Sequence, residues 1–145
     1  MDIRKAEIGD LPVLTDLALK LWPDHDREAL RCELADILAR EEAAFFIAAA
    51  EEAPVGFAQC QLRYDYVEGT ESSPVGYLEG IYVTDMHRHR GIAKALLAAC
   101  EAWAKERGCR EFASDCELGN TESLHFHLGV GFHEANRIIC FTKKI

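Results

Sequence analysis

The stretch from residue 75 to residue 108 constrains the fold of this chain more than any other part of the sequence. Val75–Val83 is rich in β-branched and aromatic residues, a pattern typical of a central strand. A short basic loop follows and ends at Gly91. The apolar residues beyond it recur at helical spacing, namely Ile92, Leu96, Ala99 and Trp103. A strand that leads through such a loop into an amphipathic helix predicts an α/β fold.

The rest of the chain supplies further expected helices and strands. Helices are expected over residues 11–21 and 27–40, with a short one from Asn120 toward Gly129. Strands are expected over residues 3–6, 45–50, 55–64 and 111–115, with one or two closing strands within 132–144. No repeat or linker interrupts the 145 residues. We therefore expect a single domain, 1–145, of the α/β (α+β) class, with a mixed, mostly antiparallel central sheet flanked by about four helices.

Acidic residues outnumber basic ones and are unevenly spread. The chain holds 16 Lys and Arg against 25 Asp and Glu, a formal net charge of −9. Residues 1–86 carry 7 basic and 18 acidic side chains, whereas residues 87–145 carry 9 and 7. The two parts could face ligands of opposite sign, or the acidic residues could simply form a solvated surface. The net charge argues against a nucleic-acid partner and fits a cationic small molecule better.

Neither a membrane span nor a secretory leader is expected. The longest apolar run, Ala43–Ala50, is far shorter than the roughly 20 residues that cross a bilayer, and Met1–Glu7 has no apolar core. We therefore expect a cytoplasmic protein with no membrane partner. The six cysteines form no C-x-x-C pair and are interpreted as small core residues. The two H-x-H pairs, at 87–89 and 125–127, have a spacing that is poor for metal on a helix, so no metal is expected.

The loop between the expected strand and helix has the composition of an anion-binding site. The first backbone N–H groups of a helix have no partner within the helix, and the helix dipole favours negative charge there. Arg88, Arg90 and Lys94 add positive charge, and Gly91 lets the backbone approach a ligand closely. The spacing Arg88-x-x-Gly91-x-Ala93 is neither a P-loop nor a G-x-G-x-x-G motif. A basic helix start without function is the alternative interpretation of these residues alone.

Two motifs, in this order along the chain, resemble the signatures of the GNAT acetyltransferase superfamily. Arg88-x-x-Gly91-x-Ala93 is similar to its Gln/Arg-x-x-Gly-x-Gly/Ala pyrophosphate loop. Further on, Asn120-x-x-Ser123-x-x-Phe126-His127-x-x-Val130-Gly131-Phe132 resembles its Asn-x-x-Ala-x-x-Leu/Phe-Tyr-x-x-x-Gly-Phe motif. The closer resemblance spans nearly the whole chain and is to the aminoglycoside 6′-N-acetyltransferases. It is carried by Leu21-Trp22-Pro23 with His25, Asp65-Tyr66-Val67, Ser72-Ser73-Pro74, Leu78-Glu79-Gly80-Ile81-Tyr82-Val83 and Ser114-Asp115.

The resemblance implies a site for acetyl-CoA between the strand that ends at Val83 and the strand from Glu111. Backbone groups of Ile81, Tyr82 and Val83 would pair with the pantetheine arm, and Asn120 would hydrogen-bond near the thioester. The pyrophosphate would be held by the basic loop and the first helical turn, namely Arg88, His89, Arg90, Gly91, Ile92, Ala93 and Lys94. Ile81 and Val83 can also be core residues of the strand, because the cofactor would use their backbone groups.

The implied reaction is direct attack of the 6′-amine of an aminoglycoside on the thioester. An amine near neutral pH is mostly ammonium, so the site must hold a cation and let it lose a proton. Glu79 and Asp115 are the candidate carboxylates for both tasks, and backbone N–H groups near Tyr82 would stabilise the carbonyl oxygen. His127 stands where the family often has the Tyr that protonates the departing CoA thiolate, and a His could replace it.

The remaining implied contacts are to the acceptor. Trp22 and Tyr66 would be flat walls against sugar rings, with His25 beside them, and Asn136 stands where another acidic contact is expected. The structural alternatives are that Trp22 closes the core of the first helix and that Glu79 is a surface carboxylate at a strand edge.

Two other functions fit the same residues. The acceptor could instead be a polyamine, another small amine or a protein amine. The chain could also be a non-catalytic CoA-binding sensor module, although a sensor needs no pair of carboxylates, such as Glu79 and Asp115, beside the thioester. Similar enzymes are commonly homodimers, and the apolar segment at residues 138–141 could pair across such an interface.

Overall fold

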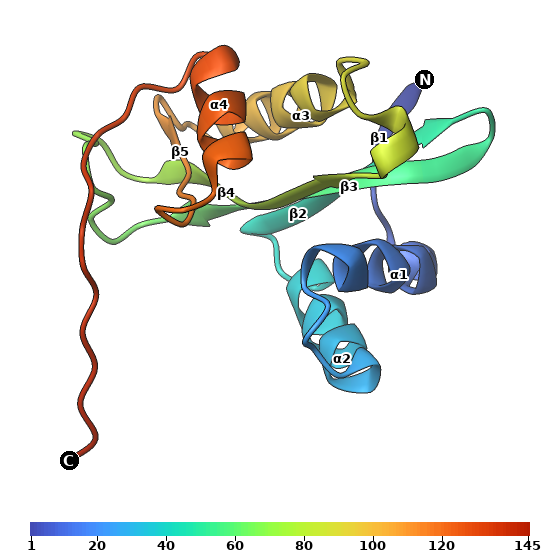
Figure 1. Cartoon of the computed structure of the whole chain (residues 1–145), viewed down its shortest axis with the longest axis horizontal. Helices are drawn as coiled ribbons and strands as arrows, with labels where there is room; N and C mark the ends of the chain where they lie inside the picture. Colours follow the sequence, from blue (N-terminus) through green and yellow to red (C-terminus); the bar gives the residue numbers. More distant parts are fainter.

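The computed structural model describes residues 1–145 and contains a five-stranded sheet with helices on both faces (Figure 1). The strands are β1 (Asp2–Lys5), β2 (Ala43–Ala50), β3 (Ala53–Arg63), β4 (Val75–Val83) and β5 (Phe112–Ala113), in that order across the sheet. The first four pair antiparallel, and β5 runs parallel to β4. The expected mixed, mostly antiparallel sheet is confirmed.

The helices lie on opposite sides of this sheet (Figure 1). They are α1 (Leu11–Leu21), α2 (Arg27–Leu38), α3 (Ile92–Glu106) and α4 (Thr121–Gly129), with short 3-10 turns η1 (Ile8–Asp10) and η2 (Asp85–His87). In the view of Figure 1, α1 and α2 lie below the sheet, and α3 and α4 lie above it. Asp26 starts α2 by accepting a hydrogen bond from the Ala29 N–H at 3.0 Å. No helix is long and apolar enough to cross a bilayer.

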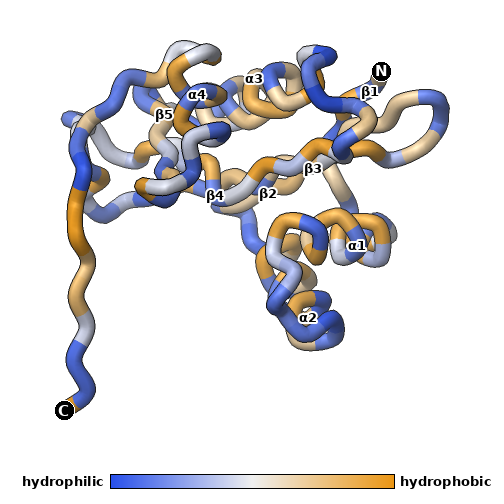
Figure 2. The backbone as a smooth tube through the Cα atoms, in the orientation of Figure 1, coloured by the Kyte–Doolittle hydropathy of each residue, from blue (hydrophilic) through white to orange (hydrophobic).

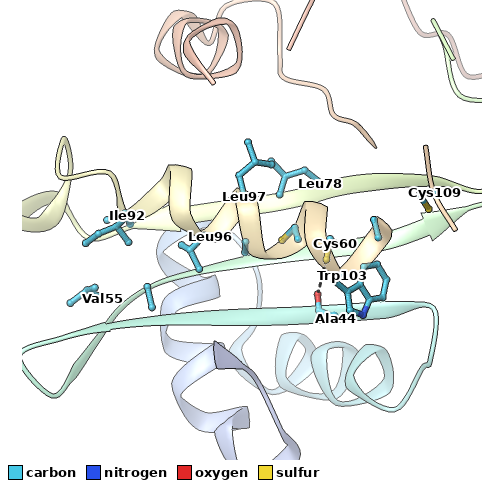
Figure 3. Close-up of a cluster of buried hydrophobic side chains, with 14 residues drawn as sticks. Ala44, Val55, Cys60, Leu78, Ile92, Leu96, Leu97, Trp103 and Cys109 are labelled. Carbon is cyan, nitrogen blue, oxygen red and sulfur yellow. Dashed lines mark hydrogen bonds between the residues drawn. The ribbon is translucent and has the colours of Figure 1, made fainter. Parts of the chain in front are cut away.

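Each face of the sheet has its own hydrophobic core. On one face, Leu96 and Trp103 of α3 pack with Cys60 of β3 in a cluster of small and aliphatic side chains (Figure 3). On the other face, α1 and α2 pack against Phe45 and Phe57, which are fully buried. Burial of apolar surface on both sides fixes the positions of the central strands, and therefore of the residues that these strands carry.

The cysteines divide into two groups of three. Cys60, Cys100 and Cys109 are buried in the core under α3, as predicted. Cys32, Cys116 and Cys140 are exposed, so the interpretation of all six as core residues is wrong for these three. Cys32 lies on the outer side of α2, whereas Cys116 and Cys140 lie in segments without regular structure, and neither location offers a core to enter.

The chain after α4 forms no strand, so the closing strands predicted within 132–144 are wrong for the isolated chain. Asn136 donates a hydrogen bond to Glu68 at 3.0 Å, and Ala135 packs so closely on Gly69 that a Cβ there would lie 2.5 Å from its own. The chain then runs away from the sheet (Figure 1), carrying an apolar stretch that is visible in Figure 2. A strand needs a neighbouring strand to pair with its backbone groups, and this segment has none within the chain.

Candidate active site

A β-bulge in β4 interrupts the sheet near its centre. Gln59 of β3 pairs with Gly80, and the next residue, Cys60, pairs with Leu78, which leaves Glu79 as the extra residue. On its other edge, β4 pairs with β5 only at Gly76 and Tyr77. The edge of β4 beyond Tyr77 therefore has no strand partner. Bulges of this kind re-aim side chains and often lie beside functional sites.

The bulge places Glu79 at a pocket between the sheet and helices α1 and α2. The pocket has a volume of about 180 Å³ and is lined by Trp22, His25, Leu30, Glu33, Leu34, Ile37, Gln59 and Glu79. The Trp22 ring lies against Gly80, where an added Cβ would approach the ring to 2.8 Å. Trp22 therefore both closes the core below the sheet and forms a pocket wall. Two carboxylates beside aromatic rings suit a cation with an apolar face.

An arginine at the end of β3 connects the two predicted carboxylates. Arg63 donates to both oxygens of Glu79, from Nη2 at 2.9 Å to Oε1 and from Nε at 3.2 Å to Oε2. Its guanidinium also stacks on the Tyr77 ring at 3.4 Å, and the Tyr77 hydroxyl donates to Asp115. Burial and this hydrogen bond raise the pKa of Tyr77, so its hydroxyl stays protonated and remains a donor. Glu79 and Asp115 thus belong to one network, linked through Arg63 and Tyr77.

The loop before α3 has the geometry that anion binding needs. Gly91, the residue before the first turn, has φ of +80°, and His89 also has a left-handed φ of +61°. No side chain caps the helix, so its first backbone N–H groups remain free for a ligand. Arg88 is turned back to the sheet, where its Nε donates to the Val83 carbonyl oxygen at 3.0 Å. Arg90 and Lys94 are exposed and make no ion pair.

The start of α4 contributes two of the predicted residues. The Asn120 side chain caps the helix by accepting from the Ser123 N–H at 3.1 Å, which leaves its NH₂ group available. His127, one helix turn after Ser123, places Nε2 at 2.7 Å from the hydroxyl of Ser114, the first residue after β5. Both ring nitrogens of His127 are therefore engaged, because Nδ1 lies 2.6 Å from the Ser123 carbonyl oxygen.

Two predicted acceptor contacts lie apart from the pocket. Tyr66 is 76% exposed in the loop between β3 and β4, where its hydroxyl accepts from the Gly69 N–H. Asn136 is hydrogen-bonded to Glu68 on the same loop. Neither residue lines the pocket that holds Trp22, His25 and Glu79.

Sequence reasoning missed Arg63, Tyr77 and Glu33. The strand register carries a signal for the first two residues. Arg63 pairs with Val75, so Tyr77 is its diagonal neighbour on the same face and lies within reach of a long side chain. This signal can be used only when the β3–β4 pairing register is known. The bulge at Glu79 shifts that register by one residue. Glu33 enters the pocket from α2, and nothing in its local sequence distinguishes it from the other acidic residues of that helix.

Known proteins resemble this chain over its whole length. Residues 11–132 match the family described as "Acetyltransferase (GNAT) family". An aminoglycoside N(6′)-acetyltransferase type 1 from Salmonella typhimurium is 42% identical over 99% of each chain. A protein of the same name from Stenotrophomonas maltophilia is 46% identical, over 99% of this chain and 93% of its own.

Solved structures agree with these relatives. AAC(6′)-Iy in complex with the bisubstrate analogue CoA-S-monomethyl-acetylneamine superimposes with a TM-score of 0.95, at 42% identity over 99% of this chain and 98% of that one. AAC(6′)-Iy in complex with CoA gives a TM-score of 0.96, at 42% identity over 99% and 95% of the two chains. The chain therefore belongs to the acetyltransferase (GNAT) family, within the group of aminoglycoside N(6′)-acetyltransferases.

Proposed function

We propose that this protein transfers the acetyl group of acetyl-CoA to the 6′-amino group of aminoglycosides, by direct attack in a ternary complex, and so inactivates them. The observation that carries the proposal is the bulge at Glu79. It separates an acidic, aromatic pocket on one face of β4 from an unpaired strand edge and a free helix start beyond it. An acceptor cation and an anionic acyl donor can therefore meet at the same strand.

The donor side rests on two kinds of free backbone group. The unpaired edge of β4 from Ile81 to Val83 offers N–H and C=O groups to the amides of a pantetheine arm, except for the Val83 carbonyl, which accepts from Arg88. The uncapped N–H groups from His89 to Lys94 are available to the pyrophosphate, with positive charge from Arg90 and Lys94. Arg88 holds the loop against β4 through the Val83 carbonyl oxygen and adds its positive charge beside the pyrophosphate. Asn120 can offer its free NH₂ group near the thioester.

The acceptor side rests on charge and shape. Glu79 and Glu33 attract ammonium groups, while Trp22 and His25 form walls against a sugar ring. Glu79 accepts a proton from the bound ammonium, directly or through water, so that the free amine can attack. Asp115, Tyr66 and Asn136 contact parts of the acceptor that extend beyond the pocket. The reaction needs no metal, because a thioester is already activated toward an amine.

The first test is release of CoA thiol by purified protein with acetyl-CoA and either neomycin or paromomycin, which carry an amine or a hydroxyl at the 6′ position. Turnover with neomycin alone supports the proposal. Turnover with both compounds moves the reaction to another amine. Turnover with neither, while acetyl-CoA still binds, favours a polyamine, another small amine, a protein amine or a sensor without catalysis.

A Glu79→Gln variant tests the residue on which the proposal rests. It keeps the shape of the side chain and removes the charge, so kcat/KM for neomycin falls by about 10²-fold or more while acetyl-CoA affinity stays close to wild type. Calorimetric titration with acetyl-CoA measures this affinity. Equal losses of turnover and of acetyl-CoA binding contradict the assigned role of Glu79.

We also propose that the protein is a cytoplasmic homodimer of single-domain chains, each spanning residues 1–145. Support comes from the C-terminal segment, where Ile138, Ile139 and Phe141 are 69%, 80% and 86% exposed. Apolar side chains in such a row are stable in water when a second copy covers them.

A further inference from the structure

The contacts of His127 fix which of its nitrogens carries the proton. Nδ1 lies 2.6 Å from the Ser123 carbonyl oxygen, which can only accept, so Nδ1–H is the donor. In the neutral ring, Nε2 is then unprotonated and accepts the hydroxyl proton of Ser114 at 2.7 Å. A hydroxyl bonded to a histidine that a third group orients is the arrangement by which proteins activate a hydroxyl for proton transfer.

Ser114 lies at the edge of the sheet that is proposed to hold the acyl donor. It follows Ala113, the last residue of β5 that pairs with β4. It therefore lies where the unpaired edge of β4 begins, which is the edge assigned to the acyl donor. The His127 ring reaches Ser114 from α4 and packs against Phe132, with ring centroids 5.1 Å apart, so one side of the pair is apolar.

Glu79 and Asp115 are already engaged as acceptors, and Glu33 enters the pocket from α2, on the acceptor side. Both oxygens of Glu79 receive hydrogen bonds from Arg63, and Asp115 receives one from Tyr77. No side chain donates a hydrogen bond to the hydroxyl oxygen of Ser114. Ser114 with His127 is therefore a second proton-accepting group, distinct from the Glu79 network and on the donor side of β4.

We propose that Ser114 and His127 form a proton relay for acetyl transfer, with Ser114 as the catalytic residue and His127 acting through it. This inference rests on the proposed function. As the amine nitrogen forms its bond to the thioester carbon, the carbonyl electron pair moves to oxygen. Ser114 then takes a proton from the nitrogen while its own proton passes to His127 Nε2.

The second half of the relay reverses these transfers. When the electron pair on oxygen returns and the C–S bond breaks, His127 gives its proton back to Ser114, and Ser114 gives a proton to the thiolate sulfur. One proton has then moved from the amine to CoA, and both residues end in their starting states. Glu79 removes the earlier proton of the ammonium, so the two networks perform different steps.

The test compares Ser114→Ala, His127→Gln and the double variant with wild type, using acetyl-CoA and neomycin. Each single change lowers kcat by about 10²-fold, with the KM of both substrates within about twofold of wild type. The double variant is no slower than the slower single variant, because either change breaks the same relay. Ser114→Thr keeps the hydroxyl and restores kcat to within about threefold of wild type. His125→Gln, at an exposed histidine on the same helix, leaves kcat unchanged.

A purely structural role gives a different pattern. If the pair only holds α4 against β5, Ser114→Ala and His127→Gln raise the KM for acetyl-CoA, lower the melting temperature and leave kcat intact, which overturns the relay. Losses that multiply in the double variant also overturn it. A wild type that acetylates a polyamine but not neomycin contradicts the proposed function alone, since the same variants then test the relay with that amine. A wild type that acetylates no amine contradicts both.

Discussion

Arg63 brings a positive charge into a site that the proposed function fills with cations. Its role is to hold the Glu79 carboxylate and the Tyr77 ring in place. The Glu79 side chain is only 19% exposed and Arg63 38% exposed, so their ion pair is partly desolvated. The guanidinium also covers the ring of Tyr77. Removal of Arg63 leaves a half-buried carboxylate without its partner, which is more costly than the loss of a surface pair.

Arg63→Met should therefore lower the free energy of unfolding by about 1–3 kcal/mol. Chemical denaturation measures this change, and a cycle with Glu79→Gln gives the coupling energy between the two side chains. Arg31→Met is the matched control, because Arg31 makes a similar two-bonded contact with Glu28 on the exposed side of α2. No measurable change is expected there. Equal losses of stability from the two substitutions would show that the Arg63–Glu79 ion pair contributes no more than an exposed surface ion pair.

Asp10 shows how one carboxylate ties the first strand to the first helix. It accepts two hydrogen bonds from Arg4, at 2.6 and 2.7 Å, and one from the Glu7 N–H at 2.8 Å. These bonds lower the pKa of Asp10 to about 2, with the Arg4 hydrogen bond as the largest cause. Asp10 immediately precedes α1, yet its side chain makes no cap bond to that helix.

The lowered pKa of Asp10 gives a pH dependence with a defined sign. An unfolded Asp binds its proton near pH 4, so the stabilisation is complete above that value and is lost as pH falls toward 2. Asp10→Asn should lower stability by about 1 kcal/mol at pH 7, and this effect should shrink as pH falls below 4 and disappear only below pH 2. Urea denaturation across this range measures the difference. Asp36→Asn, at an exposed acid of α2 without a partner, should show no such dependence.

The beginning and the end of α3 differ in their proposed function but share a backbone feature, a glycine with a positive φ. Gly91 precedes the helix with φ of +80°, and Gly108 follows it with φ of +88°. An added Cβ meets nothing within 4 Å at either position. A side chain at either glycine therefore strains the backbone without clashing, at a cost of roughly 1–2 kcal/mol.

Gly91→Ala and Gly108→Ala thus form a matched pair of variants. Both should lower stability by a similar amount, whereas only Gly91→Ala should weaken acetyl-CoA binding, by about tenfold, because it shifts the free N–H groups of the first turn. Thermal unfolding and calorimetric titration provide the two measurements. Weaker binding in both variants would indicate a general loss of stability rather than a local effect on the loop.

The exposed C-terminal segment carries apolar residues that no other part of the chain covers. These residues pack against neither hydrophobic core. Ala135 and Asn136 contact the β3–β4 loop, and the chain after them runs away from the sheet (Figure 1). In a homodimer, the second copy would cover this segment.

Substitution of Ile139 and Phe141 by Asp should therefore convert a dimer into a monomer. Light scattering after size exclusion should give twice the chain mass of 16.2 kDa for wild type and one chain mass for the variant. Lys143→Asp and Lys144→Asp, at the hydrophilic end of the same segment, form the control and should remain dimeric. A monomeric wild type contradicts the proposal directly.

Local sequence patterns predicted most of the fold. The helix at 11–21 and the strand at 75–83 have the predicted bounds, because their apolar spacing and flanking residues act over a few positions. The basic loop before Ile92 and the residue that starts α4 were also predicted, since a free helix start and an Asn cap are local properties. The resemblance to a known family added the roles expected of Glu79, Asn120 and His127.

Local patterns along the chain therefore specify the elements, their order and the residue types that carry the chemistry. Three features came from long-range packing alone: Glu79 is the extra residue of a bulge, Arg63 and Tyr77 link it to Asp115, and Ser114 meets His127. The tertiary structure also decided that residues 133–145 stay unpaired. These outcomes depend on contacts between segments far apart in the chain, where strand register and the absence of a partner strand prevail over local propensity.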